Sequence, residues 1–479
     1  MPNKSDWGGW ARISAIGIFV LIAIMGFWGF PSATYKAHAS AFGPAPSFTN
    51  APGESNCTAC HSTFPVNSGE GGITISGMPA NYLPGQQIPL TVTVSDNNGV
   101  NFGFEGTAVD SIGQKAGDLV LPSTTPEPML LQYGNVGGDV REYISHTVDG
   151  IVPTVAGTKS WQFTWTAPAR RVGKIGFYAA GNAADGTSGT ESDYIYATSA
   201  STLSGTNLSS FDGDQRSEPA VFRPSDGGWY SLNSTDGQSQ VAQWGLPEDV
   251  PAPGDYDGDG ITDRAVFRPS AGFWYLLKST EGVEWIPWGA AGDIPVAGDY
   301  DGDLKTDVAV FRPSTGYWYV RKSSGGFDFI YWGASTDICV PGDYDGDART
   351  DAAVYRPGDG TWYIKQSSDG NSFRSWGVAS DVPVQADYDG DGRYDIAVYR
   401  PSEGVWYING SRIGISARPW GVSTDIPVPA DYDGDGSTDI GVFRGSEGVW
   451  YAVNSSDNSF FIRSWGAAND VPVPNAYLP

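Results

Sequence analysis

The stretch Asp255-Tyr-Asp257-Gly-Asp259-Gly-Ile-Thr-Asp263, followed directly by Arg264-Ala-Val-Phe-Arg-Pro269, decides the fold of the C-terminal half of the chain. A weaker version of the acidic loop occupies residues 210–218. Self-similarity at a fixed period of 20–50 residues is the signature of a repeat architecture. Four further full copies of the loop follow at a spacing of 44 residues, beginning at Asp299, Asp343, Asp387 and Asp431.

Each copy of the loop leads into an apolar strand, a turn, a second strand and a third strand that ends in Trp-Gly. Short strands without a helical period predict the blades of a β-propeller. The first copy lacks a preceding strand, and residues 470–474 can supply it, so we expect a closed ring of six blades. An open solenoid is the alternative, but it would leave unpaired sheet edges. The Trp-Gly tryptophans are Trp244, Trp288, Trp332, Trp376, Trp420 and Trp465.

Carboxylates stand at positions 1, 3, 5 and 9 of each full loop, and position 7 is expected to offer a backbone carbonyl. Ca²⁺ takes six to eight oxygen ligands in irregular geometry, and carboxylates this close would repel one another without a cation. Position 12 of the first full loop is Val266, which excludes an EF-hand. Asp-Gly turns without metal are the alternative. The predicted ligands are Asp255, Asp257, Asp259, Asp263, Asp299, Asp301, Asp303, Asp307, Asp343, Asp345, Asp347, Asp351, Asp387, Asp389, Asp391, Asp395, Asp431, Asp433, Asp435 and Asp439.

The loops are not identical at position 6. Leu304 and Ala348 replace the glycine that makes the sharp turn, so we expect these two loops to bind Ca²⁺ more weakly. The weaker first copy has Ser210 at position 1 and Glu218 at position 9. The sequence therefore predicts five Ca²⁺ sites and leaves a sixth open.

The composition agrees with this interpretation. The 479 residues include 28 Lys and Arg against 54 Asp and Glu, a formal charge of −26, which argues against nucleic-acid or anionic-membrane partners. Much of the acidity lies in the repeated loops, where it would serve as metal ligand. The high counts of glycine (64) and proline (33) favour short strands joined by turns, and the length suits two to four domains.

Residues 206–479 resemble the FG-GAP/VCBS repeat family, which includes the integrin-type propellers. The resemblance rests on the DxDxDGxxD loops and on the Ala-Val-Phe-Arg-Pro strand that follows them. It implies a Ca²⁺-binding propeller. It does not define a function, because such propellers serve in adhesion, in ligand binding and as scaffolds.

Residues 1–39 are predicted to be a signal peptide. Lys4 and Arg12 precede an uncharged apolar run, residues 13–30, and the sequence Ala37-His38-Ala39 provides a small-residue cleavage site. An uncleaved anchor is the alternative, since the run approaches the length needed to span a bilayer. Either outcome predicts an exported protein, in the periplasm, on the cell surface or outside the cell. No second apolar stretch of this length occurs, so no membrane span is expected after cleavage.

Residues 40–205 carry alternating apolar stretches separated by Gly, Pro and Asn clusters, which predict a β-sandwich. The motif Cys57-Thr-Ala-Cys60-His61 precedes them. This spacing lets two thiols add to the vinyl groups of a haem while the adjacent imidazole binds the iron, so we expect one c-type haem. A Cys57–Cys60 disulfide is the alternative. A zinc site is less favoured, because no second Cys/His pair completes four ligands.

A haem iron can take a sixth ligand. His146 is the one histidine besides His61 that remains after signal cleavage, and we predict that it is the second axial ligand. Met78 and Met129 are the weaker candidates, and a histidine without a ligand role is the alternative. Ligation by two histidines would favour electron transfer, because it leaves no open coordination position.

This N-terminal domain resembles bacterial Reeler-like domains of the "choice-of-anchor" group. The resemblance rests on the sequence from Ala51 to His61, on Ile75-Ser-Gly-Met-Pro-Ala80, and on Tyr143-Ile-Ser-His-Thr147 and Phe177-Tyr-Ala-Ala-Gly-Asn182. It implies an exported β-sandwich that carries the CxxCH motif. The surface-sorting signal that usually accompanies such domains is not found here, and the role of the family does not define the function.

Together these features predict an exported, non-enzymatic protein. Its propeller would bind an unknown protein or polysaccharide, while the haem-bearing sandwich passes electrons to a redox partner. The alternative is an adhesion or matrix-binding protein in which Cys57 and Cys60 form a disulfide. A hydrolase or lyase is not favoured, because no Ser-His-Asp set is recognisable and neither His61 nor His146 lies in the repeats.

Overall fold

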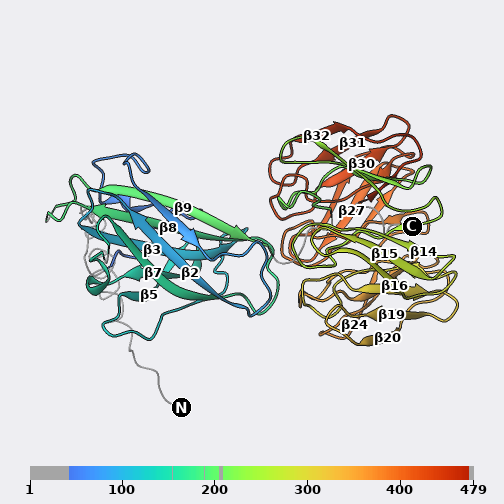
Figure 1. The fold of residues 1–479 in the computed structure, drawn as a ribbon, viewed down its shortest axis with the longest axis horizontal. Coiled ribbons are helices and arrows are strands. Elements are labelled where there is room, and N and C mark those ends of the chain that lie inside the picture. Colours follow the sequence, from blue (N-terminus) through green and yellow to red (C-terminus); the bar gives the residue numbers. More distant parts are fainter. Residues whose placement is uncertain (1–42, 154, 188, 204–208, 474–479) are drawn as a thin grey trace, which may run out of the picture.

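The computed structural model describes residues 43–473 except 154, 188 and 204–208. It consists of two β bodies, a sandwich and a ring of sheets, which lie side by side (Figure 1). The helical segments among the described residues are two 3-10 turns, η1 (Cys57–Ala59) and η2 (Val148–Gly150). The prediction of an all-β chain is therefore confirmed. The predicted signal peptide, residues 1–39, and the predicted domain boundary at 205/206 lie outside the described residues.

The sandwich packs a four-stranded sheet against a five-stranded sheet, and both sheets are antiparallel. Strand β2 alternates buried and more exposed residues, as expected for a strand with one face on the core. The first sheet contains, in order, β1 (Gly72–Ser76), β2 (Gln87–Ser95), β7 (Thr158–Thr166) and β4 (Asp118–Val120). The second contains β5 (Met129–Val136), β6 (Asp139–His146), β3 (Asn101–Asp110), β8 (Ile175–Ala184) and β9 (Tyr194–Thr202).

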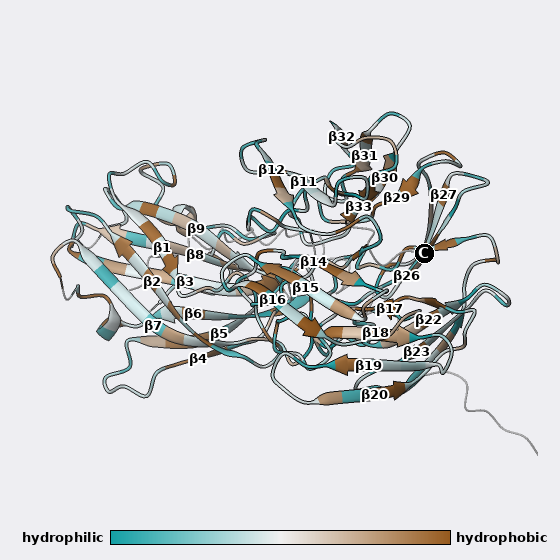
Figure 2. Cartoon of the chain, turned by 45° about the vertical axis from the view of Figure 1, so that its right-hand side comes forward, coloured by the Kyte–Doolittle hydropathy of each residue, from teal (hydrophilic) through white to brown (hydrophobic). Residues whose placement is uncertain are grey.

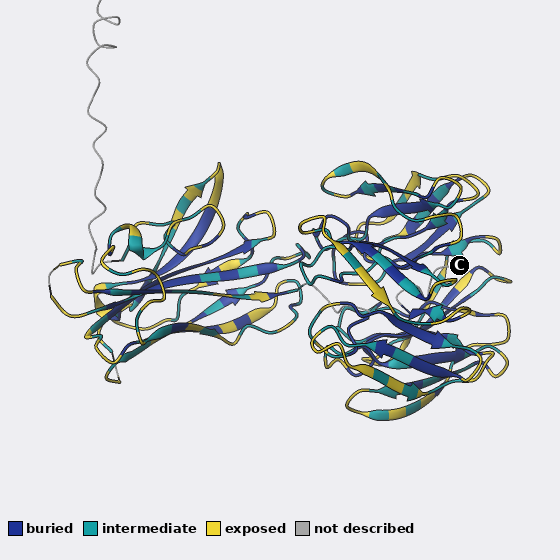
Figure 3. Cartoon of the chain, turned by 90° about the horizontal axis from the view of Figure 1, so that it is seen from above, coloured by how far each residue is buried: buried dark blue, intermediate teal, exposed yellow. Residues whose placement is uncertain are grey.

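Aromatic side chains fill the space between the two sheets. Trp161 and Phe163 of β7 pack against Phe104 of β3, and Phe163 also stacks on Phe177 of β8. All of these side chains are buried, and Figure 3 shows buried strands running through the sandwich. Burying aromatic side chains of this size is the main source of stability for such a core.

The chain segment before β1 is bound to the five-stranded sheet. The Phe48 amide donates to Glu105 of β3, and the Glu54 carboxylate accepts bonds from Arg141 and Tyr143 of β6. The Glu54–Arg141 pair measures 2.6 Å and is buried on both sides. These contacts fix the position of the Cys57–His61 motif, which lies between this segment and β1.

The second body contains six four-stranded antiparallel sheets. The first consists of β12 (Ser239–Gln243), β11 (Gly228–Leu232), β10 (Ala220–Arg223) and β33 (Val471–Pro472). The next two are β13 (Val250–Pro251), β14 (Arg264–Arg268), β15 (Phe273–Lys278), β16 (Gly282–Pro287), and β17 (Ile294–Pro295), β18 (Val308–Arg312), β19 (Tyr317–Arg321), β20 (Phe327–Tyr331). The last three are β21 (Ile338–Cys339), β22 (Ala352–Arg356), β23 (Thr361–Lys365), β24 (Asn371–Ser375); β25 (Val382–Pro383), β26 (Ile396–Arg400), β27 (Val405–Gly410), β28 (Gly414–Pro419); and β29 (Ile426–Pro427), β30 (Ile440–Arg444), β31 (Val449–Val453), β32 (Phe460–Ser464).

The six sheets form a closed ring. The indole of each Trp-Gly tryptophan donates to a tyrosine carbonyl of the following sheet, at 3.0–3.2 Å, and the last, Trp465, donates to Tyr230 of the first sheet. A second ring of hydrogen bonds joins successive acidic loops, and it closes where the Ser217 amide donates to the Asp431 carbonyl. The first sheet is completed by β33, which pairs with β10. The ring is thus closed by main-chain and side-chain bonds alike.

Each sheet repeats the same internal packing. A tryptophan of the third strand is fully buried, and an arginine that ends the second strand, such as Arg312, forms a two-point ion pair with a buried aspartate, such as Asp293. The same guanidinium lies over a tyrosine ring, Tyr319 in this sheet. These buried tryptophans of the third strands therefore pack in the apolar cores of the sheets. They are Trp229, Trp274, Trp318, Trp362, Trp406 and Trp450.

Candidate functional site

The position-1 aspartates organise the acidic loops. In the first full loop, the Asp255 carboxylate accepts hydrogen bonds from the amides of Gly258 and Gly260, at 2.6 and 2.9 Å. The same pattern recurs in the other four full loops, although the first of these two bonds is replaced in the fourth by one to the next amide. A carboxylate that accepts several backbone amides fixes a tight turn. The turn points the remaining carboxylates of the loop toward a common centre.

The position-9 aspartates tie each loop to the neighbouring hairpin. Asp263 accepts the Tyr256 amide at 2.8 Å and the Ser279 amide at 2.7 Å. Burial, together with the nearby negative charge of Asp257, raises the pKa of Asp263 to about 7 in the cation-free loop. The corresponding carboxyls are similarly placed, and their pKa values rise to about 7 or 8; they are Asp307, Asp351, Asp395 and Asp439.

Four of the five position-3 aspartates hold one carboxylate oxygen without a partner, whereas Oδ1 of Asp433 accepts the Asp435 amide. Asp257 uses Oδ2 to accept the Thr280 hydroxyl and the Glu281 amide, while its Oδ1 is buried and accepts no hydrogen bond. Buried polar atoms normally have a partner. The repetition of this feature in one place argues for a missing ligand rather than for chance. The four unpartnered oxygens are Oδ1 of Asp257, Asp301, Asp345 and Asp389.

The carboxylates at positions 1, 3 and 5 converge. Their oxygens lie within 4.8 Å of one another in the loops that begin at Asp255, Asp299 and Asp343, and positions 1, 3 and 9 do so in the loop that begins at Asp387. Such a cluster of hard oxygens fits Ca²⁺, which also tolerates the irregular angles of a loop. The spacing of the carboxylates in the sequence predicted these residues. It did not predict that Ser279 and Thr280 of the following hairpin donate hydrogen bonds to the loop.

Position 6 keeps the same backbone conformation whether or not it is glycine. Leu304 and Ala348 have φ of 69° and 71°, against 84° for Gly260. A side chain in this left-handed region is disfavoured, so these loops are folded at a cost that the glycine loops avoid. The loop geometry is therefore preserved, and the weaker binding expected there stays a prediction.

The first, degenerate loop has a glutamate at position 9. Glu218 accepts the Phe211 amide at 2.6 Å, and burial together with its contact with Asp212 raises its pKa to about 9. Asp212, Asp214 and Glu218 still place oxygens within 4.8 Å of one another. A sixth cation site at this loop stays open.

The Cys57–His61 motif forms a single tight turn on the sandwich. Asn56 caps η1 by accepting the Thr58 amide, and the His61 amide donates to the Cys57 carbonyl at 3.0 Å. Both cysteines are free thiols here. The turn thus presents the two thiols and the imidazole from five consecutive residues.

His61 is oriented by a carboxylate. Its Nδ1 lies 2.6 Å from Asp193, which is buried at the start of β9, and Asn182 of β8 approaches both ring nitrogens. A metal-binding imidazole commonly donates its second ring N–H to a carboxylate in this way. Sequence reasoning missed Asp193 and Asn182, because neither lies near the motif in the chain.

Two buried acceptors near the motif have no partner. They are Oε1 of Glu105 and Oδ1 of Asn182, on neighbouring strands of the sheet face that the motif covers. Burial raises the pKa of Glu105 to about 8, and burial together with the charge of Glu105 raises the pKa of the Cys57 thiol to about 12. The unsatisfied polar atoms and the free thiols fit a site that a further group completes.

The predicted sixth ligand lies on the same sheet. His146, at the end of β6, is buried, and its Nδ1 lies 3.0 Å from the Phe104 amide. Its ring packs against Gly103, the cross-strand partner of Asn182. Met129, opposite His146 in β5, belongs to the core, and Met78 packs against that core. The two imidazoles therefore approach neighbouring strands of one sheet, His61 at Asn182 of β8 and His146 at Gly103 of β3, and joint ligation of one iron stays a prediction.

Comparison with known proteins adds structural similarity at low identity. No family model matches the chain, and no curated protein matches it. Virginiamycin B lyase from Staphylococcus aureus is similar over 54% of this chain and 86% of its own, with 9% identity and a TM-score of 0.35. The reeler domain of human F-spondin is similar over 29% of this chain and 92% of its own, with 13% identity and a TM-score of 0.19. A streptogramin B lyase structure covers 55% of this chain and 86% of its own, with 10% identity and a TM-score of 0.38.

Among the described residues, no helix has the length and apolar character needed to cross a bilayer.

Proposed function

We propose that this chain is an exported Ca²⁺-binding propeller protein whose N-terminal sandwich carries one covalently attached c-type haem and transfers electrons outside the cytoplasm. The propeller serves as the docking surface for a redox partner, and no catalytic residues are assigned. The observation that carries the Ca²⁺ part is the buried, unpartnered Oδ1 at position 3 of four acidic loops. The haem part is supported by the two free thiols beside an imidazole that Asp193 orients.

The residues of the loops have distinct tasks in this proposal. Positions 1, 3, 5 and 9 supply carboxylate oxygens, and position 7 supplies a carbonyl. Position 1 also holds the turn through backbone amides, and position 9 connects it to the next hairpin. A bound cation would neutralise carboxylates that otherwise lie close together in a buried place.

On the sandwich, Cys57 and Cys60 would hold the haem through their sulfurs, and His61 would face the iron with Nε2 while Nδ1 stays bonded to Asp193. The haem supplies reversible one-electron chemistry when bound. Asp193 keeps the imidazole in one tautomer and one orientation. His146 would be the second histidine ligand of the iron.

An absorption spectrum tests the haem assignment. The mature protein is exported in a host with haem-attachment machinery, and spectra are recorded before and after dithionite. Sharp reduced bands that survive acid–acetone extraction are expected, and they should vanish in Cys57→Ser/Cys60→Ser. His146→Ala should lose low-spin character if His146 is the sixth ligand. A colourless protein with a Cys57–Cys60 disulfide would refute the electron-transfer proposal.

A second candidate function is Ca²⁺-dependent adhesion or ligand binding without haem. It is favoured by aromatic side chains on the outer strands of two neighbouring sheets: Trp285 of β16 and Phe329 and Tyr331 of β20 are 61–67% exposed. Figure 2 shows hydrophobic segments along β20. Exposed apolar patches often mark binding surfaces. Retention of the protein on an immobilised glycan or protein, lost on substitution of Phe329 and Tyr331 by serine, would support this candidate.

A further inference from the structure

One loop of the sandwich reaches the face of the propeller that carries the acidic loops. This loop, residues 170–174, connects β7 to β8. The Arg171 amide donates to the Gly346 carbonyl at 2.8 Å, and the Lys174 ammonium donates to the Gly434 carbonyl at 2.7 Å. Both acceptors are position-4 glycines of acidic loops. Ser111 approaches the position-4 glycine between them, Gly390.

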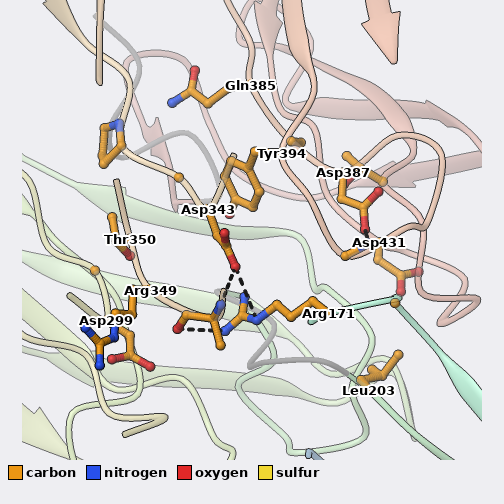
Figure 4. A pocket seen from close by; sticks show the side chains of 18 of the residues that line it. Arg171, Leu203, Asp299, Asp343, Arg349, Thr350, Gln385, Asp387, Tyr394 and Asp431 are labelled. Atoms are coloured by element: carbon orange, nitrogen blue, oxygen red, sulfur yellow. Dashed lines mark hydrogen bonds and ion pairs between the residues drawn. The ribbon is translucent and has the colours of Figure 1, made fainter. Parts of the chain in front are cut away.

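We call this contact between the sandwich loop, residues 170–174, and the acidic loops the joint. Charged side chains reinforce it. The Arg170 guanidinium makes two bonds to the Asp369 carboxylate and a third to the Asp345 carbonyl. The Arg171 guanidinium forms an ion pair with the buried Asp343 carboxylate (Figure 4), and it donates to the Ala348 carbonyl. The nitrogen and oxygen of the ion pair are 3.5 Å apart. Three cations from five consecutive residues thus face acidic loops.

The two backbones approach each other closely at the joint. A Cβ on Gly173 would lie 2.1 Å from the Gly390 carbonyl oxygen, and one on Gly392 would lie 2.6 Å from Arg171. A Cβ on Gly436 would lie 2.9 Å from Lys174. Contacts this close require the acidic loops to hold one conformation.

The joint covers one end of the ring axis. A cavity of about 270 Å³ lies there, lined by Arg171 and Leu203 of the sandwich and by position-1 aspartates of successive loops, among them Asp299, Asp387 and Asp431 (Figure 4). The sandwich therefore sits where the acidic loops of several repeats converge.

We propose that Ca²⁺ in the loops that begin at Asp343, Asp387 and Asp431 locks the sandwich onto the propeller, so that the cation controls the joint between the two domains. This inference rests on the proposed Ca²⁺ binding. The carbonyls of Gly346, Gly390 and Gly434 face the sandwich because each loop is folded into a tight turn. Without a cation, four carboxylates per loop repel one another and the turn opens. Three acceptors of the joint are then lost together.

Charge does not prevent docking of the loaded loops. A loop with four carboxylates and one Ca²⁺ keeps a formal charge of about −2, so it still attracts Arg171 and Lys174. The coupling is reciprocal: if Ca²⁺ favours docking, then docking raises the Ca²⁺ affinity by the same factor. Couplings of this kind typically amount to about 5- to 150-fold.

The repeats supply matched controls. Asp345→Asn and Asp389→Asn remove an unpartnered position-3 carboxylate from loops that contact the sandwich, while the Asp345 main-chain carbonyl bound by Arg170 is kept. Asp257→Asn and Asp301→Asn make the same change in two other loops, and in the described part of the chain the position-4 carbonyls of these loops accept no hydrogen bond from residues 170–174. Arg171→Ala/Lys174→Ala weakens the joint from the other side and keeps every proposed Ca²⁺ ligand in the chain, while it removes the ion pair of Arg171 with Asp343.

The test combines hydrogen exchange of the peptide that contains Arg171 with small-angle scattering of the full mature chain and metal analysis. In the wild type and in Asp257→Asn/Asp301→Asn, saturating Ca²⁺ should slow exchange at the Arg171 amide about 5- to 150-fold relative to EDTA and reduce the radius of gyration. Asp345→Asn/Asp389→Asn should lose both responses. Arg171→Ala/Lys174→Ala should be extended in Ca²⁺ while still binding the metal.

The outcomes separate the two proposals. If metal analysis finds no bound Ca²⁺, the proposed Ca²⁺ function is overturned, and this inference falls with it. If Ca²⁺ binds but exchange at Arg171 and the radius of gyration are the same in EDTA, this inference alone is overturned. Equal responses of the two Asp→Asn pairs would also overturn it, because docking would then not depend on the contacting loops.

Discussion

The sandwich and the propeller carry their buried polar groups in different ways. The sandwich holds a cluster that occurs only once in the sequence, in which Glu54, Arg141, Glu105 and the Cys57–His61 motif depend on contacts between distant segments. The propeller repeats one loop, and each copy is stabilised mainly by residues of its own repeat. A single change can therefore disable the sandwich cluster, whereas the propeller loses one copy of several and keeps the others as internal controls.

The largest expected effect comes from removing calcium. EDTA should lower the unfolding temperature of the propeller more than that of the sandwich, because the acidic loops belong to the propeller and the sandwich loses only its contacts with them. Each site adds about 2.7 kcal/mol at a free Ca²⁺ concentration 100 times its Kd. Scanning calorimetry of the full chain with Ca²⁺ and with EDTA should resolve the two transitions. A propeller transition that ignores EDTA would contradict the prediction.

Breaking the buried Glu54–Arg141 ion pair should lower the free energy of unfolding of the sandwich substantially. The loss should be smaller than the loss that calcium removal causes in the propeller. Arg141→Leu leaves Glu54 buried without its cation, which typically costs about 3–5 kcal/mol. Urea unfolding followed by a sandwich signal measures the loss. Arg312→Leu is the matched change in the propeller, and the half-exposed position of its guanidinium predicts a smaller loss. Equal losses would contradict this argument from the exposure of the guanidinium.

With Ca²⁺ present, the stabilities of the two bodies should change with pH in opposite directions. In EDTA, the position-9 carboxyls have a folded pKa of about 7 or 8 against an ordinary 3.8, so their folded state retains protons that the unfolded chain has released. Propeller stability should fall as pH rises from about 4 to 7. With Ca²⁺, which binds the ionised form, it should rise over this window. Glu105, with a pKa of about 8, should make sandwich stability fall with pH in both buffers. Urea midpoints at pH 5 and 7.5 test this, and a Ca²⁺-independent trend in the propeller would contradict it.

The smallest expected effect concerns position 6 of the loops. Gly260→Ala adds a Cβ whose nearest neighbour lies 4.0 Å away, so the change tests the positive φ without a clash. It should cost about 1–2 kcal/mol. Ala348→Gly should bring a smaller gain in the opposite direction, with a tighter Ca²⁺ site. Calcium titration calorimetry on the two variants measures both, and effects of the same sign would refute the strain argument.

The 44-residue repeat allowed the propeller to be predicted from the sequence. The carboxylate positions and the missing strand of the first unit could be identified because the same residues recur at one spacing. The surroundings of the Cys57–His61 motif could not, since Asp193 and Asn182 occur once and meet His61 only in the folded sheet. The same holds for residues 170–174, whose basic side chains carry no sequence signal for the loops they contact.

The closed ring has a consequence for the order of events during synthesis. The sheet of β10, β11 and β12 receives its fourth strand from residues 471–472, and the indole of Trp465 bonds to Tyr230. One edge of strand β10 therefore stays unpaired until more than 240 further residues have been synthesised. An exposed edge is a template for pairing with other chains. The time between the appearance of the first and the last sheet is thus the interval in which this protein is most vulnerable to aggregation, and a chaperone that covers β10 would act within it.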